Sequence, residues 1–507
     1  MPTRQYLMGG KVLCHAYAKA RELNILIEND QIIDVLPART KVQDAQPVDV
    51  SGKLIHPGLV NPHTHGHATL TKGMADRWSL ELLLTAGPSI NNNRRLQDKY
   101  LSTLLGAAEL ALKGCTAVYD ITFEMPLPTL EGIFANGQAY SDIGIRAVIA
   151  PMVSDIHFFQ AIPGLMERLP PEVQKQYTGL SSPTQAIMSC MQDMLKQWPA
   201  NLPLIKPALG PTIPLHCSKA LWQGCINLAK EYNLGIQTHL LETKLQALAG
   251  LERYGKTITA YLKELGALDL GRNFVAAHGV WLNDDDMDML GQAGVTVAHN
   301  PGSNMILGSG LADVRRMLEH GINVAIGTDS PNCSDNLNMY ENMREALRIS
   351  HIVTPETQKW LGAAEIFAMA TENGAQALGI KNIGRISQGF QADLVFLDMS
   401  HPNWLPVNDV VTQLVQGEDG TAVHSVMVAG RWVVKDRRLV NRQLGQLREQ
   451  VQSTVAYLAQ QNKQDKALFN RLCPIVAGFC PAFMHAPYDV ERLTPASETA
   501  VSKSRKT

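Results

Sequence analysis

The sequence predicts an α/β protein in which a (β/α)8 barrel, or TIM barrel, is joined to a small β-sandwich. The chain has 507 residues, well above the about 250 residues that one such barrel commonly takes. Its central part alternates short β-branched runs with amphipathic stretches that end near glycine, which is typical of βα units. Its two ends carry alternating strand patterns instead, which indicates a second unit.

The second unit is expected to draw strands from both ends of the chain. LNILIENDQIIDVLP (residues 23–37) and VDVSGKLI (48–55) alternate apolar and polar residues around turn signals. GFQADLVFLD (389–398) and AVHSVMVAGRWVVKDRRLV (422–440) repeat this pattern after the central part. Residues 1–57 and 385–440 are therefore predicted to form one composite β-sandwich.

The barrel is predicted to span residues 58–384, because eight candidate strands fall in or at the edge of this range. Helices such as SKALWQGCINLAKEYN (218–233) and LADVRRMLEH (311–320) lie between them, with apolar residues at three-to-four spacing. The expected strands are HPGLVNPH (56–63), GCTAVYD (114–120), GIRAVIAP (144–151), LIKPALGPT (204–212), LGIQTH (234–239), NFVAAH (273–278), GVTVAH (294–299) and INVAIGTD (322–329).

Residues 441–507 are predicted to be a helical C-terminal extension with a disordered end. NRQLGQLREQVQSTVAYLAQQNK (441–463) places apolar residues at helical spacing, which indicates a helix lying on the body of the protein. SETAVSKSRKT (497–507) has the composition of a disordered tail.

The composition is that of a soluble globular protein, with 45% hydrophobic residues, 18% charged residues and a formal net charge of -2. This charge gives no electrostatic case for a nucleic-acid partner. The eight cysteines form no CxxC pair, and the first residues, MPTRQYLMGG, do not resemble a signal peptide. We see no run of about 18 consecutive apolar residues, so we expect a cytoplasmic protein with no membrane association.

Several of the expected strands end in histidine or aspartate. Because the carboxyl ends of all barrel strands meet on one face, His63, His239, His278, His299 and Asp329 should become neighbours. In NPHTHGH, His63, His65 and His67 alternate along an extended chain, so adjacent pairs point to one side. Imidazoles together with a carboxylate suit Zn²⁺ or Fe²⁺ better than Mg²⁺ or Ca²⁺.

These motifs resemble the amidohydrolase superfamily, specifically its cytosine/guanine deaminase and triazine chlorohydrolase branch. The resemblance rests on PGLVNPHTH, GIRAV, QTHLLET, AAHGVWL, VAHNPGSNMILGSGLADV, GTDSPNCSDNLNMYENMREAL and GRISQGFQADLVFLD, and it extends to about residue 440. It implies one divalent metal per chain, with zinc favoured and iron as the alternative. It also implies a homodimer or higher homo-oligomer.

Carried over residue by residue, the resemblance implies His63, His65, His239 and Asp329 as metal ligands. Glu242 then matches the proton shuttle, and His278 matches a histidine beside the metal-bound water. His67 is left without a ligand role. In such a site, metal-bound hydroxide would attack an amidine-like ring carbon of a small-molecule substrate. Asp329 would accept the water proton, Glu242 would protonate the ring nitrogen, and ammonia would leave.

The expected substrate is an aminated purine, pterin, pyrimidine or triazine-like ring, and the sequence suggests contacts from Trp78, Arg146, His216 and Asn304. Trp78 could instead be helix core, Arg146 a salt bridge at the barrel rim, and Asn304 a hydrogen-bond partner of another site residue. Purine-type deaminases of this branch usually read PHAPYTCS after strand four, whereas this chain reads PTIPLHCS. This difference argues against an adenosine-like substrate.

Two other functions use the same fold. The first is the release of chloride or an alkylamine from a triazine, or the opening of a cyclic amide, by the same site. The retained Glu242 favours a leaving group that needs a proton, and hence an amine. The second is a non-enzymatic scaffold, which predicts missing ligand residues, whereas all of them are present.

Overall fold

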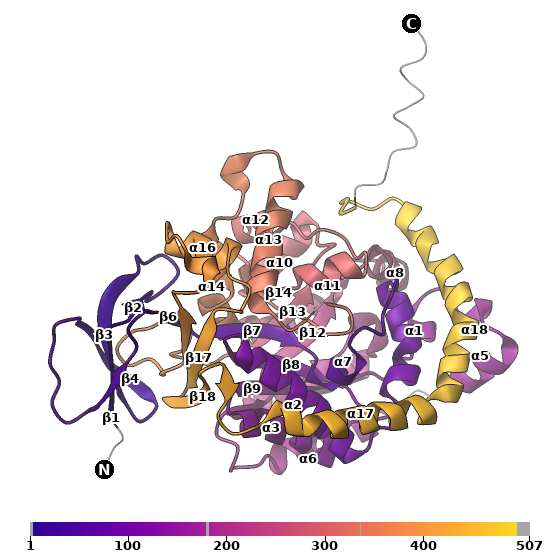
Figure 1. Ribbon diagram of the computed structural model, residues 1–507. Coiled ribbons are helices and arrows are strands. Elements are labelled where there is room, and N and C mark those ends of the chain that lie inside the picture. Colours follow the sequence, from indigo (N-terminus) through magenta and orange to yellow (C-terminus); the bar gives the residue numbers. More distant parts are fainter. Residues whose placement is uncertain (1–3, 179–181, 335, 494–507) are drawn as a thin grey trace, which may run out of the picture.

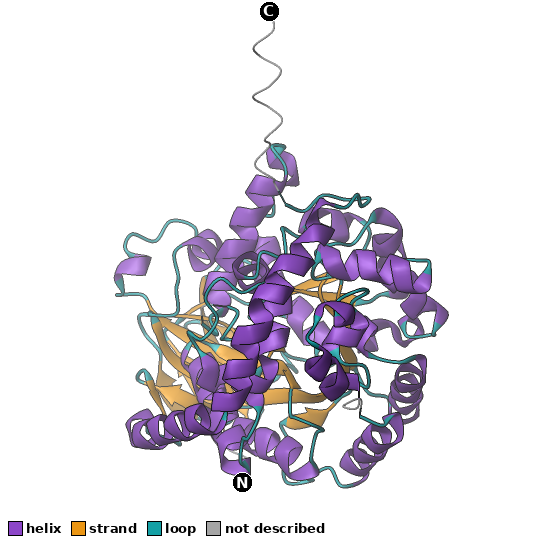
Figure 2. Ribbon diagram, turned by 90° about the vertical axis from the view of Figure 1, so that its right-hand side faces the viewer, coloured by secondary structure: helices purple, strands orange, loops and turns teal. Residues whose placement is uncertain are grey.

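A computed structural model describes residues 4–178, 182–334 and 336–493 of the chain. The fold is α/β, with strands in the interior and helices packed around them (Figure 2). Figure 1 shows the strands from the two chain ends on one side of the molecule and the last two long helices on the other. The predicted disordered tail lies outside the described residues.

The central strands form two parallel sheets that contact each other at both edges. In the first sheet β8 pairs with β7 and β9, and β9 also pairs with β10 and β11. In the second sheet the order is β12-β13-β14-β15. Parallel bridges Leu209↔Ile236 and Thr64↔Asp329 connect the two sheets. The strands are β7 (Leu59–Thr64), β8 (Cys115–Thr122), β9 (Arg146–Val153), β10 (Ile205–Pro207), β11 (Gly210–Pro211), β12 (Ile236–Leu240), β13 (Phe274–His278), β14 (Thr296–His299) and β15 (Asn323–Ile326).

All eight predicted strand segments are therefore confirmed as strands, with LIKPALGPT divided between β10 and β11. Because every pairing and both bridges are parallel, the carboxyl ends of these strands face the same side. The strand-end histidines and Asp329 are thereby directed to one region of the molecule.

Helices cover the outside of these sheets. The predicted helix 218–233 is α7, which begins after Ser218, whose hydroxyl accepts a hydrogen bond from the Leu221 amide, and ends at the left-handed Asn233. The helices up to the last sheet strands are α1 (Leu80–Asn91), α2 (Leu96–Leu112), α3 (Leu130–Ile143), α4 (Phe158–Ala161), α5 (Pro171–Thr178), α6 (Thr184–Lys196), α7 (Lys219–Tyr232), α8 (Lys244–Tyr254), α9 (Ile258–Glu264), α10 (Asp284–Ala293), α11 (Pro301–Ile306), α12 (Val314–Glu319), α13 (Met339–Val353), α14 (Ala363–Met369), α15 (Glu372–Ala377) and α16 (Val410–Gln416).

Strands from both chain ends share one ten-stranded sheet. The junction is the antiparallel pair β6–β16, in which Ile55 lies opposite Phe396. Leu7, Ile25 and Met427 join these two residues in one buried apolar cluster. The strands are β1 (Arg4–Met8), β2 (Lys11–Val12), β3 (Arg21–Glu28), β4 (Gln31–Pro37), β5 (Gln46–Asp49), β6 (Lys53–Pro57), β16 (Leu394–Asp398), β17 (Val423–Val428), β18 (Arg431–Lys435) and β19 (Arg438–Leu439).

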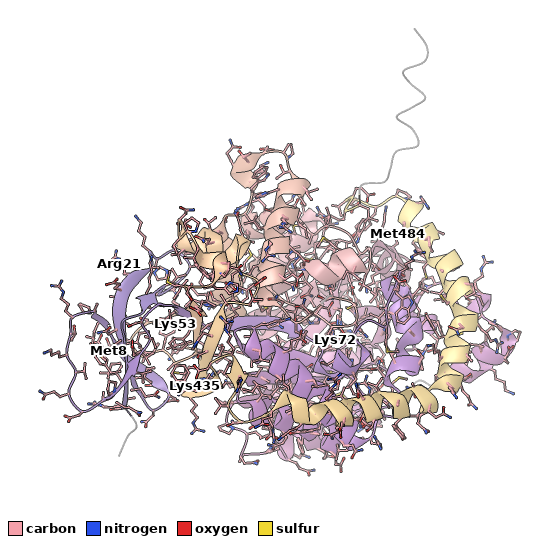
Figure 3. All side chains as sticks on the ribbon, viewed as in Figure 1. Met8, Arg21, Lys53, Lys72, Lys435 and Met484 are labelled. Atoms are coloured by element: carbon pink, nitrogen blue, oxygen red, sulfur yellow. The ribbon has the colours of Figure 1, made fainter. Side chains whose placement is uncertain are left out.

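The described part of the C-terminal extension contains two long helices, α17 (Leu444–Gln461) and α18 (Lys463–Phe479), followed by a short 3-10 helix (Cys480–His485). The predicted helix in residues 441–463 is thus confirmed. α18 packs on α1, and Figure 3 labels Met484 beyond its end, far from Met8 and Arg21 of the N-terminal strands. The Met484 carbonyl accepts a hydrogen bond from Lys244 at the start of α8.

One helical stretch among the described residues, Lys463–His485, is long and apolar enough to cross a membrane by length and composition, with a mean hydropathy of 1.4. It is not an uninterrupted apolar run, because Pro474 and several polar residues interrupt its sequence. Leu472 and Val476 of this stretch are buried against α4 and α5. A single such helix is weak evidence for a membrane span.

Candidate metal centre and its cavity

Four predicted ligand residues meet at the carboxyl ends of the strands. His63 lies in β7, His65 directly follows it, His239 lies in β12, and Asp329 follows β15. His65 Nε2 is 3.3 Å from His239 Nε2 and 3.2 Å from Asp329 Oδ1. His63 Nε2 is 3.4 Å from the same carboxylate oxygen. All four side chains are buried.

In each of the three imidazoles, Nδ1 donates a hydrogen bond to an oxygen atom. His65 Nδ1 donates to the Ile121 carbonyl and His239 Nδ1 to the Thr212 carbonyl. His63 Nδ1 donates to Gln237 Oε1, whose amide orientation is set because Gln237 Nε2 donates to the Pro62 carbonyl. These partners place the protons on Nδ1, so the three Nε2 lone pairs point inward.

This arrangement fits a bound divalent metal. Two unprotonated nitrogens that face each other at 3.3 Å repel unless a cation lies between them. His63 Nε2 is buried and has no hydrogen-bond partner among the described residues. The ligand atoms of His63, His65 and His239 lie within 4.8 Å of one another, as do those of His63, His278 and Asp329. Imidazole nitrogens with one carboxylate suit Zn²⁺ or Fe²⁺.

Glu242 and His278 lie beside this cluster. His278 Nδ1 donates to Asn304 Oδ1 at 2.9 Å, which directs His278 Nε2 to the centre. That nitrogen is 3.5 Å from Glu242 Oε2 and 3.9 Å from Asp329 Oδ2. Glu242 Oε1 is buried without a hydrogen-bond partner among the described residues. A carboxylate and an imidazole are therefore available for proton transfer next to the candidate metal site.

The backbone at three of these strand ends is in the left-handed region that non-glycine residues rarely adopt. φ is 49° at Leu241, 76° at His278 and 57° at Asp329. The turn at Leu241 comes just before Glu242, and the other two turns carry candidate site residues themselves. Such conformations cost free energy and cluster at functional sites, where the surrounding structure maintains them.

Burial and neighbouring charges separate the pKa values of the two carboxyl groups. Burial raises the pKa of Glu242 well above its usual range, and the Asp329 charge adds to this effect. Burial also raises the pKa of Asp329, but its close contacts with the imidazoles of His63 and His65 outweigh this effect and lower the pKa well below its usual value. Burial and the adjacent imidazoles of His63 and His65 lower the pKa of His239. Two carboxyl groups with opposite shifts can serve as a proton donor and a proton acceptor.

The centre opens into a cavity of about 280 Å³, which we call the metal cavity. His65, His239, His278, Glu242 and Asp329 contribute to its lining. Its walls are largely apolar and come from α1, from the loop after β8, and from the α4–α5 segment. They include Leu80, Leu83, Leu84, Met125, Pro126, Met152, Ile156, Phe158, Tyr177 and Ile213. A largely apolar cavity with a few polar groups suits a small organic ligand such as an aromatic ring.

Two of the four predicted substrate contacts lie near the reacting centre. His216 is buried and lines the metal cavity. Asn304 does not line it but holds His278 by the hydrogen bond described above, which was the alternative considered for this residue. His67, which had no ligand role, also lines the cavity.

The other two, Arg146 and Trp78, lie elsewhere. Arg146 begins β9, at the end of the strand opposite the site, and its guanidinium donates to both carboxylate oxygens of Asp393 at 2.8 and 3.0 Å. Trp78 packs edge-on against Phe469 of α18, with ring centroids 5.1 Å apart. Neither lines the metal cavity. A salt bridge and a helix contact account for these residues, because both side chains find their partners outside the cavity.

Sequence reasoning missed the groups that orient the ligands. Gln237 lies two residues before His239 on the same strand, so both side chains face the same side, and this spacing could have identified it. The carbonyl partners Ile121 and Thr212 carry no side-chain signal at all. Cavity-wall residues such as Tyr177 also lack one, because an apolar helix face looks the same wherever it packs.

A model described as the amidohydrolase family matches residues 54–433. The 5-methylthioadenosine/S-adenosylhomocysteine deaminase of Thermococcus sibiricus is 32% identical over 429 residues, which cover 84% of this chain and 93% of that protein. The 5′-deoxyadenosine deaminase of Methanothermobacter thermautotrophicus is 33% identical over 426 residues, which cover 83% and 91%.

Two solved structures have a similar fold. An adenosine deaminase from Xanthomonas campestris with bound zinc superimposes with a TM-score of 0.79 and 26% identity, covering 90% of this chain and 99% of that one. A zinc complex of a mutant atrazine chlorohydrolase from Arthrobacter aurescens has a TM-score of 0.78 and 22% identity, covering 89% and 99%. At this identity the second similarity concerns the fold alone.

Proposed function

This chain belongs to the amidohydrolase family, and we propose that it is a metal-dependent hydrolase that releases ammonia from an aminated N-heterocycle of the adenine type. The observation that carries the proposal is the meeting of three inward-facing imidazoles and Asp329 with Glu242 and His278 in one buried centre. The overall reaction replaces the ring amino group by the oxygen of water and releases ammonia.

We propose that His63, His65, His239 and Asp329 hold one divalent metal per chain, with zinc favoured and iron as the alternative. When bound, such a metal lowers the pKa of a coordinated water and so makes a nucleophile available near neutral pH. Gln237 and the carbonyl groups of Ile121 and Thr212 hold the imidazoles in the ligating orientation.

The chain's own groups move the protons. Asp329 Oδ2 accepts a proton from the attacking water, because its Oδ1 already faces His63 and His65. Glu242, whose Oε1 has no hydrogen-bond partner among the described residues, delivers its proton to the ring nitrogen. The proton that Asp329 took from the water then passes to the departing amine, and the second water proton, released as the ring carbonyl forms, restores Glu242. His278 Nε2, 3.5 Å from Glu242 Oε2, lies where it can orient the ring during these transfers.

Two observations support an adenine-type ring. Two relatives that are at least 32% identical carry names of adenosine-derivative deaminases. The metal cavity also offers apolar walls for a flat ring. The PTIPLHCS segment argued against such a substrate because Thr212 replaces a histidine. However, the Thr212 carbonyl holds His239, and His216, four residues later, places an imidazole in the same cavity.

We further propose that the two parallel sheets are halves of one closed (β/α)8 barrel at residues 58–384, because bridges join them at both edges. Residues 1–57 and 385–440 would be the composite β-sandwich, and residues 441–507 the C-terminal extension. A cytoplasmic homodimer or higher homo-oligomer remains part of the proposal.

The test is ammonia release by zinc-loaded protein from a panel of aminated purines, pterins, pyrimidines and triazines. Chloride and alkylamine release from substituted triazines are measured in parallel. We expect ammonia from adenine nucleosides, at rates well above those for the other rings. Chloride or alkylamine as the only product would replace the deaminase proposal with the hydrolase alternative. No product from any ring, with metal bound, would reject the substrate class.

A further inference from the structure

A second cavity, of about 250 Å³, adjoins the metal cavity and has no part in the proposed reaction. We call it the side chamber. The two cavities share four lining residues, His67, Asn91, Phe123 and Met125. A substrate whose ring lies at the metal centre therefore has the side chamber directly beside it.

Arg94, in the connection between α1 and α2, supplies a positive charge to the side chamber. Its two terminal nitrogens donate to the carbonyl groups of His67 and Ile90. Its Nε–H is buried and has no acceptor, and no carboxylate lies within ion-pair distance, among the residues that the structure describes. Burial lowers the pKa of Arg94 to about 10, so the side chain is still cationic at neutral pH.

The other charged groups of the chamber do not balance this cation. Lys99 and Glu124, which also line it, form an ion pair with each other. Asp98, the nearest carboxylate in sequence, attracts Arg94 only through its charge, because its oxygens accept hydrogen bonds from Arg95. Leaving a buried cation without an anionic partner costs free energy. The side chamber therefore carries one positive charge that a ligand could neutralise.

His67 adds a second donor. The Phe123 amide donates to His67 Nδ1 at 3.2 Å. The ring therefore accepts at Nδ1 and carries its proton on Nε2, which is the reverse of His63, His65 and His239. This difference explains why the third histidine of HTHGH does not join the ligand set. Its Nε2–H is a hydrogen-bond donor in a residue that lines both cavities.

We propose that the side chamber binds an anionic oxygen group, a carboxylate or a phosphate, on the part of the substrate that is remote from the reacting carbon, with Arg94 Nε–H and His67 Nε2–H as donors. Arginine forms its strongest hydrogen bonds with these two groups. The inference rests on the proposed function, because the reacting ring must lie at the metal centre for its remote end to reach the chamber.

The experiment measures binding without turnover, by isothermal titration calorimetry on the zinc-loaded full chain carrying Glu242→Gln. The probes are adenosine, adenosine 5′-monophosphate and S-adenosylhomocysteine, which offer no anion, a phosphate and a carboxylate. We expect at least one anionic probe to bind about 10-fold or more tightly than adenosine, as one charge-assisted hydrogen bond allows. The preferred probe identifies which anion the chamber takes.

Adding Arg94→Met should reduce this ratio of affinities to about one. Arg431→Met is the matched control, because it removes the same charge from an exposed position of β18 that does not line the chamber. If Arg94→Met destabilises the fold because the hydrogen bonds of Arg94 to two carbonyl groups are lost, a pair of His67 variants replaces it. His67→Gln keeps a donor near the Nε2 position and should retain the preference, whereas His67→Phe removes the donor and should weaken it.

An unchanged ratio in Arg94→Met, or equal binding of all three probes before it is introduced, would overturn the proposal. These outcomes are distinguishable from failure of the proposed function. If an anionic probe binds in an Arg94-dependent way but the wild-type protein releases no ammonia from any ring, the anion-binding proposal stands and the deaminase proposal is rejected. If the wild-type protein releases ammonia but the anionic probes bind no more tightly than adenosine, the deaminase proposal stands and the anion-binding proposal is rejected.

Discussion

The floor and the walls of the metal cavity are built in different ways. The floor consists of polar side chains at the carboxyl ends of parallel strands. His65 and His239 are held by carbonyl groups next to them, and His63 is held by Gln237 of β12 in the other sheet. The walls consist of apolar helices that are held by a segment far away in sequence, the C-terminal extension. The floor should therefore depend on single residues, whereas the walls should depend on packing distributed over many contacts.

The sharpest test of the floor is His239→Ala. This change removes one of three converging imidazoles, and we expect the purified protein to lose its metal and all measurable activity. Changes to groups that merely orient a ligand already cost about 10- to 100-fold in metal affinity. Metal content by mass spectrometry checks this. His320→Ala, at a histidine paired with Asp288 on the surface, should keep full occupancy. A fully metallated His239→Ala protein would contradict the ligand assignment.

Glu242→Gln separates the metal from the proton transfer. The amide has the same shape but cannot deliver a proton, so we expect normal metal content and a loss of about 10²-fold or more in kcat. Glu264→Gln, at a glutamate paired with Lys256 on the surface, is the matched control and should leave kcat unchanged. Turnover at the wild-type rate in Glu242→Gln would remove this residue from the mechanism.

The meeting of the floor residues could be predicted from the sequence because its signals are local. A strand that ends in His or Asp, repeated in HPGLVNPH, LGIQTH, NFVAAH and INVAIGTD, places each side chain at the same face once the strands are parallel. Carbonyl partners such as Ile121 could not be predicted, because every residue has the same carbonyl group. Gln237 could have been, from its spacing to His239.

The walls could not be predicted in this way. Trp78 and the leucines of α1 have the same apolar pattern whether they face a substrate or a helix. Only the structure shows that α18 covers Trp78 while Leu80, Leu83 and Leu84 face the cavity. The role of Arg146 could not be decided from the sequence either, because its partner Asp393 is 247 positions away in the chain.

Phe469→Ala tests the walls. The ring is buried between α18 and Trp78, and removing it should destabilise the contact by about 3 kcal/mol, as large-to-small core changes do. Because α1 lines the cavity, we expect a several-fold rise in KM with little change in metal content. Denaturant unfolding and steady-state kinetics measure both. Val455→Ala, at an exposed position of α17, is the control. If the protein loses stability but KM is unchanged, packing by the C-terminal extension does not affect substrate binding in the metal cavity.

The smallest effect is expected from the pH response of one wall residue, His157. Its ring packs against Phe159 and Tyr177, and burial lowers its pKa to about 4. His216, whose ring contacts Phe158 of the same wall, also remains neutral, because burial lowers its pKa to about 3.

Because the folded pKa of His157 is below the unfolded value of about 6.5, the unfolded chain binds more protons between these two pH values. The wall's contribution to stability is therefore complete above about pH 6.5 and is lost as the pH falls toward 4. Hydrogen exchange of α4 and α5 at pH 7 and pH 5 measures this loss, and His157→Phe should reduce it because phenylalanine cannot take up a proton. Equal pH dependence in both proteins would show that other groups control the wall.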